Sequence, residues 1–285
     1  LISPTDPVSV LGVLREENVP ASLQSAVAGE SLFNDGMGIV VFTILLGAAV
    51  TGADFSLGEG ARLFVIEAGG GVAMGLVIGW LGFRALRSMD EYTLEVLITL
   101  AVVMGGYALC TQLHVSGPLA MAVAGLLIGN HGANLAMSDL TLDYVNKFWE
   151  LVDEVLNSVL FLLIGLEVIA LVPGVRELLF GLAAIVITLV ARAIAVGGAI
   201  KAIPAARLST PGSGRVLWWG GLRGGISVAL ALSLPAGSTR DLLLAATFAA
   251  VLFSVLVQRA TLGKLIDSLK AAHSPVMDGS GRGAD

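Results

Sequence analysis

Five ionisable residues stand deep within apolar stretches of the sequence, where charged side chains are rare: Asp6, Glu30, Asp35, Arg192 and Arg223. On insertion scales each such charge costs about 2.5–3.5 kcal/mol at the centre of a membrane helix, so these side chains must face a protein interior or water. Three acids against two arginines leave one uncompensated negative charge. A site for one monovalent cation, or for one proton, requires that charge.

The densest polar run is residues 28–36, AGESLFNDG. Ser31 and Asp35 are four residues apart and share one face of a helix, and Glu30 and Asn34 share the neighbouring face. A hydroxyl beside a carboxylate makes a good oxygen site for a hard monovalent ion, and the second face suits a salt bridge to an arginine. A plainer alternative stays open, in which Asn34 and Asp35 only hydrogen-bond a neighbouring helix.

Two apolar segments are interrupted by residues that disfavour a helix. Ser3-Pro4-Thr5-Asp6-Pro7 places two prolines around a Thr-Asp pair, and residues 220–225 read GGLRGG. Proline frees the carbonyl one turn back, and freed backbone groups are tolerated at membrane depth only where they line a cavity or find partners. A pair of interrupted spans marks the midplane site of many transporters. We expect Asp6 to neutralise positive half-helix ends and Arg223 negative ones.

The elements that position these residues are predicted to be membrane helices. Charged residues make up 13% of the chain and hydrophobic residues 56%, with a mean hydropathy of +0.89, whereas soluble domains carry about 25% charged residues. A span needs about 20 apolar residues. By that rule we expect an all-α polytopic membrane protein with nine spans, the sixth led by an interfacial amphipathic helix over 139–154. The spans are residues 1–14, 22–50, 62–84, 93–113, 117–130, 150–172, 178–201, 215–234 and 241–262.

The basic residues predict an orientation for these spans. Of the 16 Lys and Arg, two lie within the membrane, and only Arg62, Arg176 and Arg240 of the others fall on one side. This positive-inside bias places the C-terminus in the cytoplasm. We expect residues 1–264 to form a partial transport domain and 265–285 a disordered cytoplasmic tail. The chain opens with Leu1 inside an apolar segment, so we expect a C-terminal portion of a longer protein.

Several classes of protein are disfavoured by composition. A net charge of −6 argues against nucleic-acid binding, and the single Cys110 has no second cysteine for a disulfide or a zinc site. No cofactor is indicated. A polytopic intramembrane enzyme is the alternative from another class, but the chain lacks paired aspartates of the GxGD kind, an HExxH motif and a Ser/His dyad.

Four motifs resemble those of the NhaP-like monovalent cation/proton antiporters, the family that includes the sodium/proton exchangers. They are Thr5-Asp6-Pro7, Glu30-Ser31-Leu32-Phe33-Asn34-Asp35-Gly36, the run FLLIGLE at 161–167 and Gly221-Leu222-Arg223-Gly224-Gly225. They occur in the family's order. The resemblance implies a fold of inverted repeats with two interrupted, crossing helices, of which this chain would be the C-terminal two-thirds.

The resemblance also implies a role for each site residue. Asp35 would carry the cation or the proton, with Ser31 and Thr5 as further sodium ligands. Asp6 would balance the helix dipoles, and Asn34 is the neutral residue that precedes the aspartate in this branch. Glu30 would pair with Arg223, with Arg192 supporting the same network, and the sequence does not decide which arginine is the closer partner. Further ligands are expected from helices that precede this chain, and a homodimer is the family's usual assembly.

The expected function is therefore secondary transport and not enzyme catalysis. A monovalent cation, Na⁺ in the first place and K⁺ as the alternative, would be exchanged for H⁺ by alternating access at Asp35. With Asn34 in place of a second acid, we expect one proton per cation and electroneutral exchange. The expected location is a bacterial plasma membrane, and the partners are the lipid bilayer, the cation and the proton. Ligand types alone do not choose between Na⁺, Li⁺ and K⁺.

Overall fold

The computed structural model describes residues 1–51, 56–132, 137–170, 174–202 and 212–273, and these are helical with no strand among them. The helices are α1 (Pro7–Glu16), α2 (Ala21–Thr51), α3 (Leu57–Phe64), α4 (Gly70–Leu86), α5 (Tyr92–Gln112), α6 (Gly117–Leu127), α8 (Asp139–Ala170), α9 (Val175–Ala202), α10 (Ser213–Trp219), α11 (Gly225–Leu232), α12 (Ser238–Phe253) and α13 (Arg259–His273). Three π-helical turns are η1 (Val65–Gly69), η2 (Ile128–Gly132) and η4 (Ser254–Gln258).

Five of the described helical stretches are long and apolar enough to cross a membrane, and a shorter apolar helix covers Gly117–Asn130. The five are Ala21–Val50, Leu57–Leu86, Tyr92–Gln112, Val175–Ala202 and Ser238–Ala271. This confirms an all-α membrane protein in the described part of the chain, while the count of nine spans stays a prediction. Helix α13 continues to His273, past residue 264 where we expect the transport domain to end, and 274–285 lie outside the described residues.

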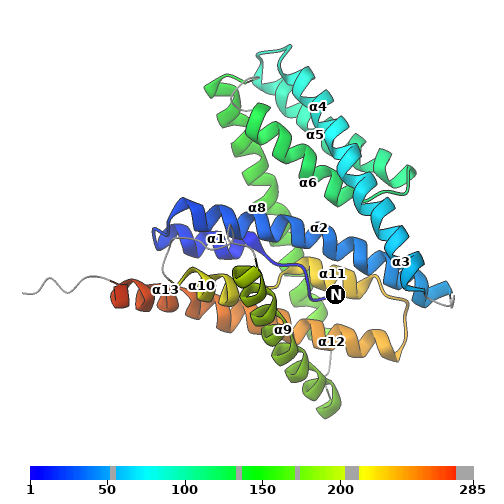
Figure 1. Cartoon of the computed structure of the whole chain (residues 1–285), viewed down its shortest axis with the longest axis vertical. Coiled ribbons are helices and arrows are strands. Elements are labelled where there is room, and N and C mark those ends of the chain that lie inside the picture. The colour runs from blue at the N-terminus through cyan, green and yellow to red at the C-terminus, as the bar shows by residue number, and fades with distance from the viewer. Residues whose placement is uncertain (52–55, 133–136, 171–173, 203–211, 274–285) are drawn as a thin grey trace, which may run out of the picture.

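The helices form two groups that are joined by α2, α3 and α8 (Figure 1). In one group α4, α5 and α6 pack together, and in the other α1, α2 and α9–α13 surround the interrupted segments. Helix α8 contacts α5 in the first group and α11 in the second. The amphipathic stretch 139–154 and the apolar stretch after it form one continuous helix, α8.

Close packing of α4 on α6 depends on small residues. A Cβ atom at Gly75 would lie 2.4 Å from the carbonyl oxygen of Ala120, and one at Gly79 would lie 2.9 Å from the Cα of Ala124. Membrane helices gain little from the hydrophobic effect between them, so small residues that allow backbones to approach are favoured at such interfaces.

A buried apolar cluster holds the second group together around the interrupted helix. Four leucines, each 0–1% exposed, pack in one cluster. They are Leu14 of α1, Leu23 of α2, Leu222 between α10 and α11, and Leu262 of α13. At its rim the Lys270 ammonium lies 3.0 Å from the Glu17 carboxylate. The hydrogen bond from Lys270 holds the pKa of Glu17 below its usual range.

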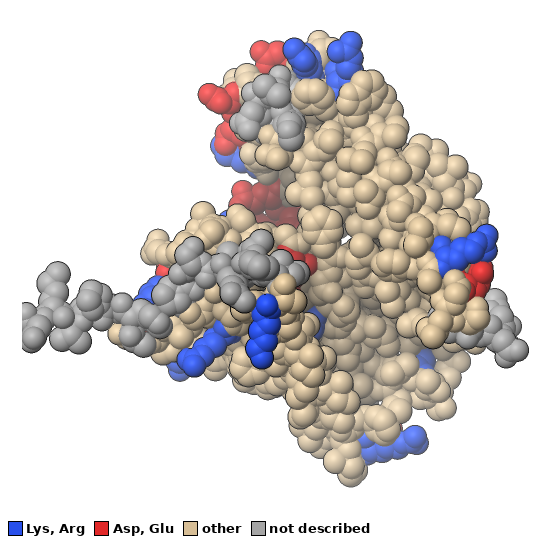
Figure 2. Space-filling model, viewed as in Figure 1, with Lys and Arg blue, Asp and Glu red and all other residues tan. Residues whose placement is uncertain are grey.

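Most of the face that Figure 2 shows carries no charged side chains, and the charged ones gather in a few places, mostly near its edges. Helix α9 is a clear example, because Ile187 and Ile194 are 67% and 69% exposed. Contiguous exposed apolar surface of this kind marks a membrane or interaction surface. Together with the long apolar helices, it indicates a multi-pass membrane protein. Acidic side chains also line a hollow between the two groups of helices (Figure 2).

Candidate ion-binding site

Two non-helical stretches meet at the centre of the second group. Residues 1–6 precede α1, and residues 220–224, here called the break segment, separate α10 from α11. The amide of Asp6 donates a hydrogen bond to the carbonyl of Leu222 at 2.8 Å, so the two stretches contact each other directly. The glycines of GGLRGG therefore lie in a break between two helices, and Pro4 lies in a non-helical stretch before α1, as the sequence predicts.

Asp6 caps α1 at this contact. Its Oδ1 accepts from the amides of Val8 and Ser9 at 3.1 and 3.3 Å, and its Oδ2 accepts from the Ser9 hydroxyl at 2.5 Å. A carboxylate at a helix N-terminus is favoured by the unsatisfied amides and by the positive end of the helix dipole. Asp6 therefore lies at the positive end of a helix, and its role in balancing the helix dipoles stays a prediction.

Asp35 lies against the same stretch from α2. Its Oδ1 accepts a hydrogen bond from the amide of Thr5 at 2.8 Å, and the Thr5 hydroxyl donates to Oγ of Ser31 at 3.0 Å. Thr5 and Ser31 are each 4% exposed. Among the described residues no ion pair involves Asp35. The structure thus brings together the carboxylate and the two hydroxyls that the sequence singles out.

Arg223 projects from the break segment onto the N-terminal stretch. It is 6% exposed, and its guanidinium donates to the carbonyl of Ser3 and, at 3.3 Å, to that of Pro4. Asn34 exchanges two hydrogen bonds with Ser3, at 2.8 Å to the hydroxyl and 2.6 Å to the carbonyl. A cation beside freed carbonyls satisfies groups that would otherwise be orphaned at membrane depth.

The partner of Glu30 is Arg192 of α9. The Arg192 Nη1 lies 2.8 Å from Glu30 Oε1, and its Nη2 donates to Oε2 at 3.2 Å. Arg223, the other candidate, forms no ion pair with Glu30 in the described structure. Sequence spacing left this choice open because α9 and the break segment both approach α2, and only the packing decides which guanidinium reaches the carboxylate.

Arg192 also stabilises the end of α10. Its Nε donates to the carbonyls of Leu217 and Trp218 at 3.0 and 3.2 Å, and its Nη2 donates to Leu217 at 2.8 Å. These carbonyls belong to the last turn of α10, which has no intrahelical donors. A Cβ atom at Gly221 would lie 1.9 Å from Arg192 Nε. The glycine therefore makes room for the arginine that links α2, α9 and α10.

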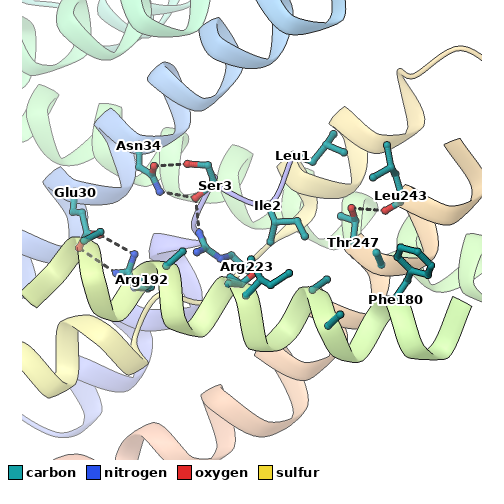
Figure 3. A pocket seen from close by; sticks show the side chains of 17 residues that line it. Leu1, Ile2, Ser3, Glu30, Asn34, Phe180, Arg192, Arg223, Leu243 and Thr247 are labelled. Atoms are coloured by element: carbon teal, nitrogen blue, oxygen red, sulfur yellow. Dashed lines mark hydrogen bonds and ion pairs between the residues drawn. The ribbon is translucent and has the colours of Figure 1, made fainter. Parts of the chain in front are cut away.

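Two cavities border the contact. The smaller, of about 200 Å³, is lined by Asp35, Thr5 and Asp6 together with Asp153 and Asn157 of α8. The larger, of about 790 Å³, lies between the N-terminal stretch, α2, α9 and α12 (Figure 3). Its polar lining includes Glu30, Asn34, Arg192 and Arg223, and its remaining walls are mainly apolar.

Asp153 and Asn157 are polar residues that sequence reasoning missed. The stretch 139–154 alternates acidic and apolar residues, which we interpret as an interfacial helix, so Asp153 did not stand out. Its position four residues before Asn157 was the available signal, since residues at that spacing share a helix face. The continuation of α8 into the second group brings this face to the cavity that contains Asp35.

Comparison with known proteins decides the family. Residues 1–267 match the family described as "Sodium/hydrogen exchanger, transmembrane". The chain belongs to the sodium/hydrogen exchanger family. The predicted resemblance is thereby confirmed.

The relatives of this exchanger chain are bacterial antiporters. It is 50% identical over 277 residues to the Na⁺/H⁺ antiporter NhaP of Pseudomonas aeruginosa, covering 96% of this chain and 65% of that protein. It is 39% identical to the Na⁺/H⁺ antiporter NhaH of Halobacillus dabanensis, covering 94% of this chain and 67% of that protein. With the low-affinity Na⁺/H⁺ antiporter NhaS1 of Synechocystis the identity is 37%, over 91% of this chain and 50% of that protein.

Proposed function

We propose that this chain carries the ion site of a secondary transporter that exchanges a monovalent cation, Na⁺ in the first place, for H⁺. The observation that carries the proposal is the environment of Asp35. Its carboxylate accepts one backbone hydrogen bond from Thr5, lies beside two buried hydroxyls and borders a cavity, without an ion pair in the described structure. The names of the relatives support Na⁺ and H⁺ as the exchanged ions.

Competition for one carboxylate would couple the two ions. Asp35 would bind a dehydrated cation, with oxygens of Thr5 and Ser31 as further ligands, or a proton. Because the carboxylate binds either ion in its charged form, loading one displaces the other. The Glu30–Arg192 pair supports this role for Asp35, since Glu30 already has a cationic partner at 2.8 Å and does not compete for the transported ion.

The proposed ratio of protons to cations rests on Asn34, the residue before Asp35 in the sequence. Asn34 is uncharged, and both ends of its amide are engaged by Ser3. Because Asn34 supplies no second carboxylate next to Asp35 in α2, we propose one proton per cation, so that exchange moves no net charge. Exchange of K⁺ by the same mechanism is the second candidate, since oxygen ligands alone do not fix the size of the site.

The wider architecture is also part of the proposal. Alternating access would move the site between the two membrane faces by one group of helices shifting against the other. We propose inverted repeats and nine spans in this chain, a cytoplasmic C-terminus as the basic residues predict, a bacterial plasma membrane and a homodimer. The chain spans 65% of the length of the Pseudomonas aeruginosa relative.

The test is proton flux from proteoliposomes that contain the full-length protein. A sodium pulse should release protons from acid-loaded vesicles, and Asp35→Asn should abolish this release while leaving expression and folding intact. Asp143→Asn is the control, because Asp143 lies in an exposed ion pair with Lys147. Retained exchange in Asp35→Asn would remove this residue from the proposed role. Pulses of lithium and potassium compare the cations.

The electroneutral mechanism has its own measurement. A potassium gradient with valinomycin imposes a membrane voltage on the same vesicles. For one-to-one exchange the sodium-driven proton flux should be independent of that voltage. A flux that rises or falls with the voltage would contradict the stoichiometry while leaving exchange itself intact.

A further inference from the structure

The last turn of α10 has a donor for each of its terminal carbonyls. The last four carbonyls of a helix lack intrahelical partners, and at membrane depth they need other donors. Val216 accepts from the amide of Gly220 at 2.7 Å, and Arg192 serves Leu217 and Trp218. The final carbonyl, that of Trp219, accepts from the side-chain amide of Gln258 at 3.1 Å.

The side-chain oxygen of Gln258 is also held, and this orients its amide nitrogen for the contact with Trp219. Its Oε1 accepts a hydrogen bond from the Ser254 hydroxyl at 2.7 Å, so its amide nitrogen is directed toward Trp219. Ser254 and Gln258 are 1% and 3% exposed. They are the first and last residues of the π-helical turn η4, and such turns within α-helices occur frequently at functional sites.

The indole of Trp219 adds a second link to the same helix. Its Nε1 donates to Oγ1 of Thr261 at 2.9 Å, and Thr261 is three residues beyond Gln258. The backbone and the side chain of Trp219 are therefore both held by the η4–α13 helix. Immediately after Trp219 the chain leaves α10 and enters the break segment.

A short path of contacts leads from this point to the ion site. The break segment contacts Asp6 through the Leu222 carbonyl at 2.8 Å, and the next residue back, Thr5, donates to Asp35 at 2.8 Å. A change in the position of the α10 terminus is passed on to the backbone that carries the Thr5 amide and hydroxyl. Each link is a direct hydrogen bond or a chain neighbour, and none requires a rearranged side chain.

We infer that Gln258 is a positioning residue of the ion site, fixing the end of α10 and through it the break segment against Thr5 and Asp6. The inference rests on the proposed function of Asp35 as the ion carrier. Gln258 does not touch the ion. It acts by holding the backbone that supplies the ligands, so its loss should weaken cation binding more than it slows the transport cycle.

The test compares Gln258→Leu with a matched glutamine in the full-length protein. Gln24 also donates its amide to a backbone carbonyl, that of Val19 at 2.8 Å, but this carbonyl precedes α2 and belongs to neither of the two non-helical stretches. We expect Gln258→Leu to raise the apparent KM for sodium about fivefold, the effect of losing about one hydrogen bond, with the maximal rate little changed. Gln24→Leu should leave the KM at the wild-type value.

A second variant covers the case in which Gln258→Leu does not fold. Ser254→Ala keeps the glutamine but releases its orientation, and it should raise the KM about twofold, a smaller effect because Gln258 can still donate to Trp219. Sodium-dependent thermal stabilisation of the purified protein supplies a readout besides transport, and the sodium concentration for half-maximal stabilisation should rise in parallel in both variants.

The outcomes separate this inference from the proposed function. Wild-type KM and wild-type sodium stabilisation in Ser254→Ala and in any folded Gln258→Leu would overturn the role of Gln258, even if the folding yield fell. Failure of the proposed function would instead appear as absent sodium-driven proton flux in the wild-type protein, or as normal flux in Asp35→Asn.

Discussion

The backbone amide of Asp6 lies 2.8 Å from the carbonyl oxygen of Leu222, and this hydrogen bond joins two stretches more than two hundred residues apart in the sequence. One stretch precedes α1 and the other separates α10 from α11, and each contains backbone groups without helical partners. The hydrogen bond between them gives a partner to one such amide and one such carbonyl. The carboxylate of Asp35, the hydroxyl of Ser31 and the guanidinium of Arg223 are all placed by reference to this contact.

Removal of Arg192 should destabilise the protein more than removal of Glu30. Glu30→Ala leaves a guanidinium that still has carbonyl partners, whereas Arg192→Ala strands Glu30 and also frees the carbonyls of Leu217 and Trp218. Breaking such a pair should cost about 3 kcal/mol. The exposed pair Glu59–Arg62 is the control, and its loss should cost under about 1 kcal/mol. Thermal unfolding in detergent measures the order of stability of these variants. Equal effects of Arg192→Ala and Glu59→Ala would contradict the prediction.

Two substitutions of Asp6 should separate the effect of its helix cap from the effect of its charge. Asp6→Asn retains an oxygen that accepts from Val8 and Ser9, so the melting temperature should stay close to that of the wild type. Asp6→Ala removes the cap and should cost about 1 kcal/mol. The missing negative charge near Asp35 should weaken sodium binding in both variants. A wild-type sodium affinity in Asp6→Asn would mean that Asp6 serves only as a helix cap.

Gly221 should not tolerate a methyl group. Gly221→Ala would drive its Cβ into the guanidinium of Arg192, which is already held by Glu30 and two carbonyls, and overpacking of this kind costs about 1–3 kcal/mol. Gly12→Ala is the matched control, because a Cβ at this helical position meets no atom within 4 Å. That variant should be neutral or stabilising by up to about 1 kcal/mol. Comparable melting temperatures for the two variants would count against the packing described for Arg192.

Asp153 should contribute to ion entry or binding, although sequence reasoning overlooked it. It lines the cavity that also contains Asp35, so Asp153→Asn removes a negative charge that attracts cations. We expect a higher apparent KM for sodium, with the largest effect at low ionic strength, because charges of this kind are screened by salt. Glu154→Gln, at an exposed neighbouring position on α8, is the control. An equal effect of both variants would indicate a general surface charge effect.

Composition and residue spacing were enough to indicate the class of the protein and to single out most residues of the candidate site. Long apolar stretches with few charges must be membrane helices, and charges within them must be partnered or functional, because burying a lone charge in lipid costs several kcal/mol. This logic identified Asp6, Glu30, Asp35, Arg192 and Arg223. Proline and clustered glycine also predicted both non-helical stretches, since these residues act on the backbone locally.

Which of these groups meet depends on how the helices pack against one another. The sequence allows Glu30 to pair with either arginine, and the packing of α9 against α10 places Arg192 beside it. Asp153 and Gln258 lie in stretches that read as ordinary helix, and only the packing of α8 and η4 brings Asp153 to the Asp35 cavity and Gln258 to the end of α10. Helical periodicity reports which residues share a face of one helix, but it carries no information on which other helix that face will contact.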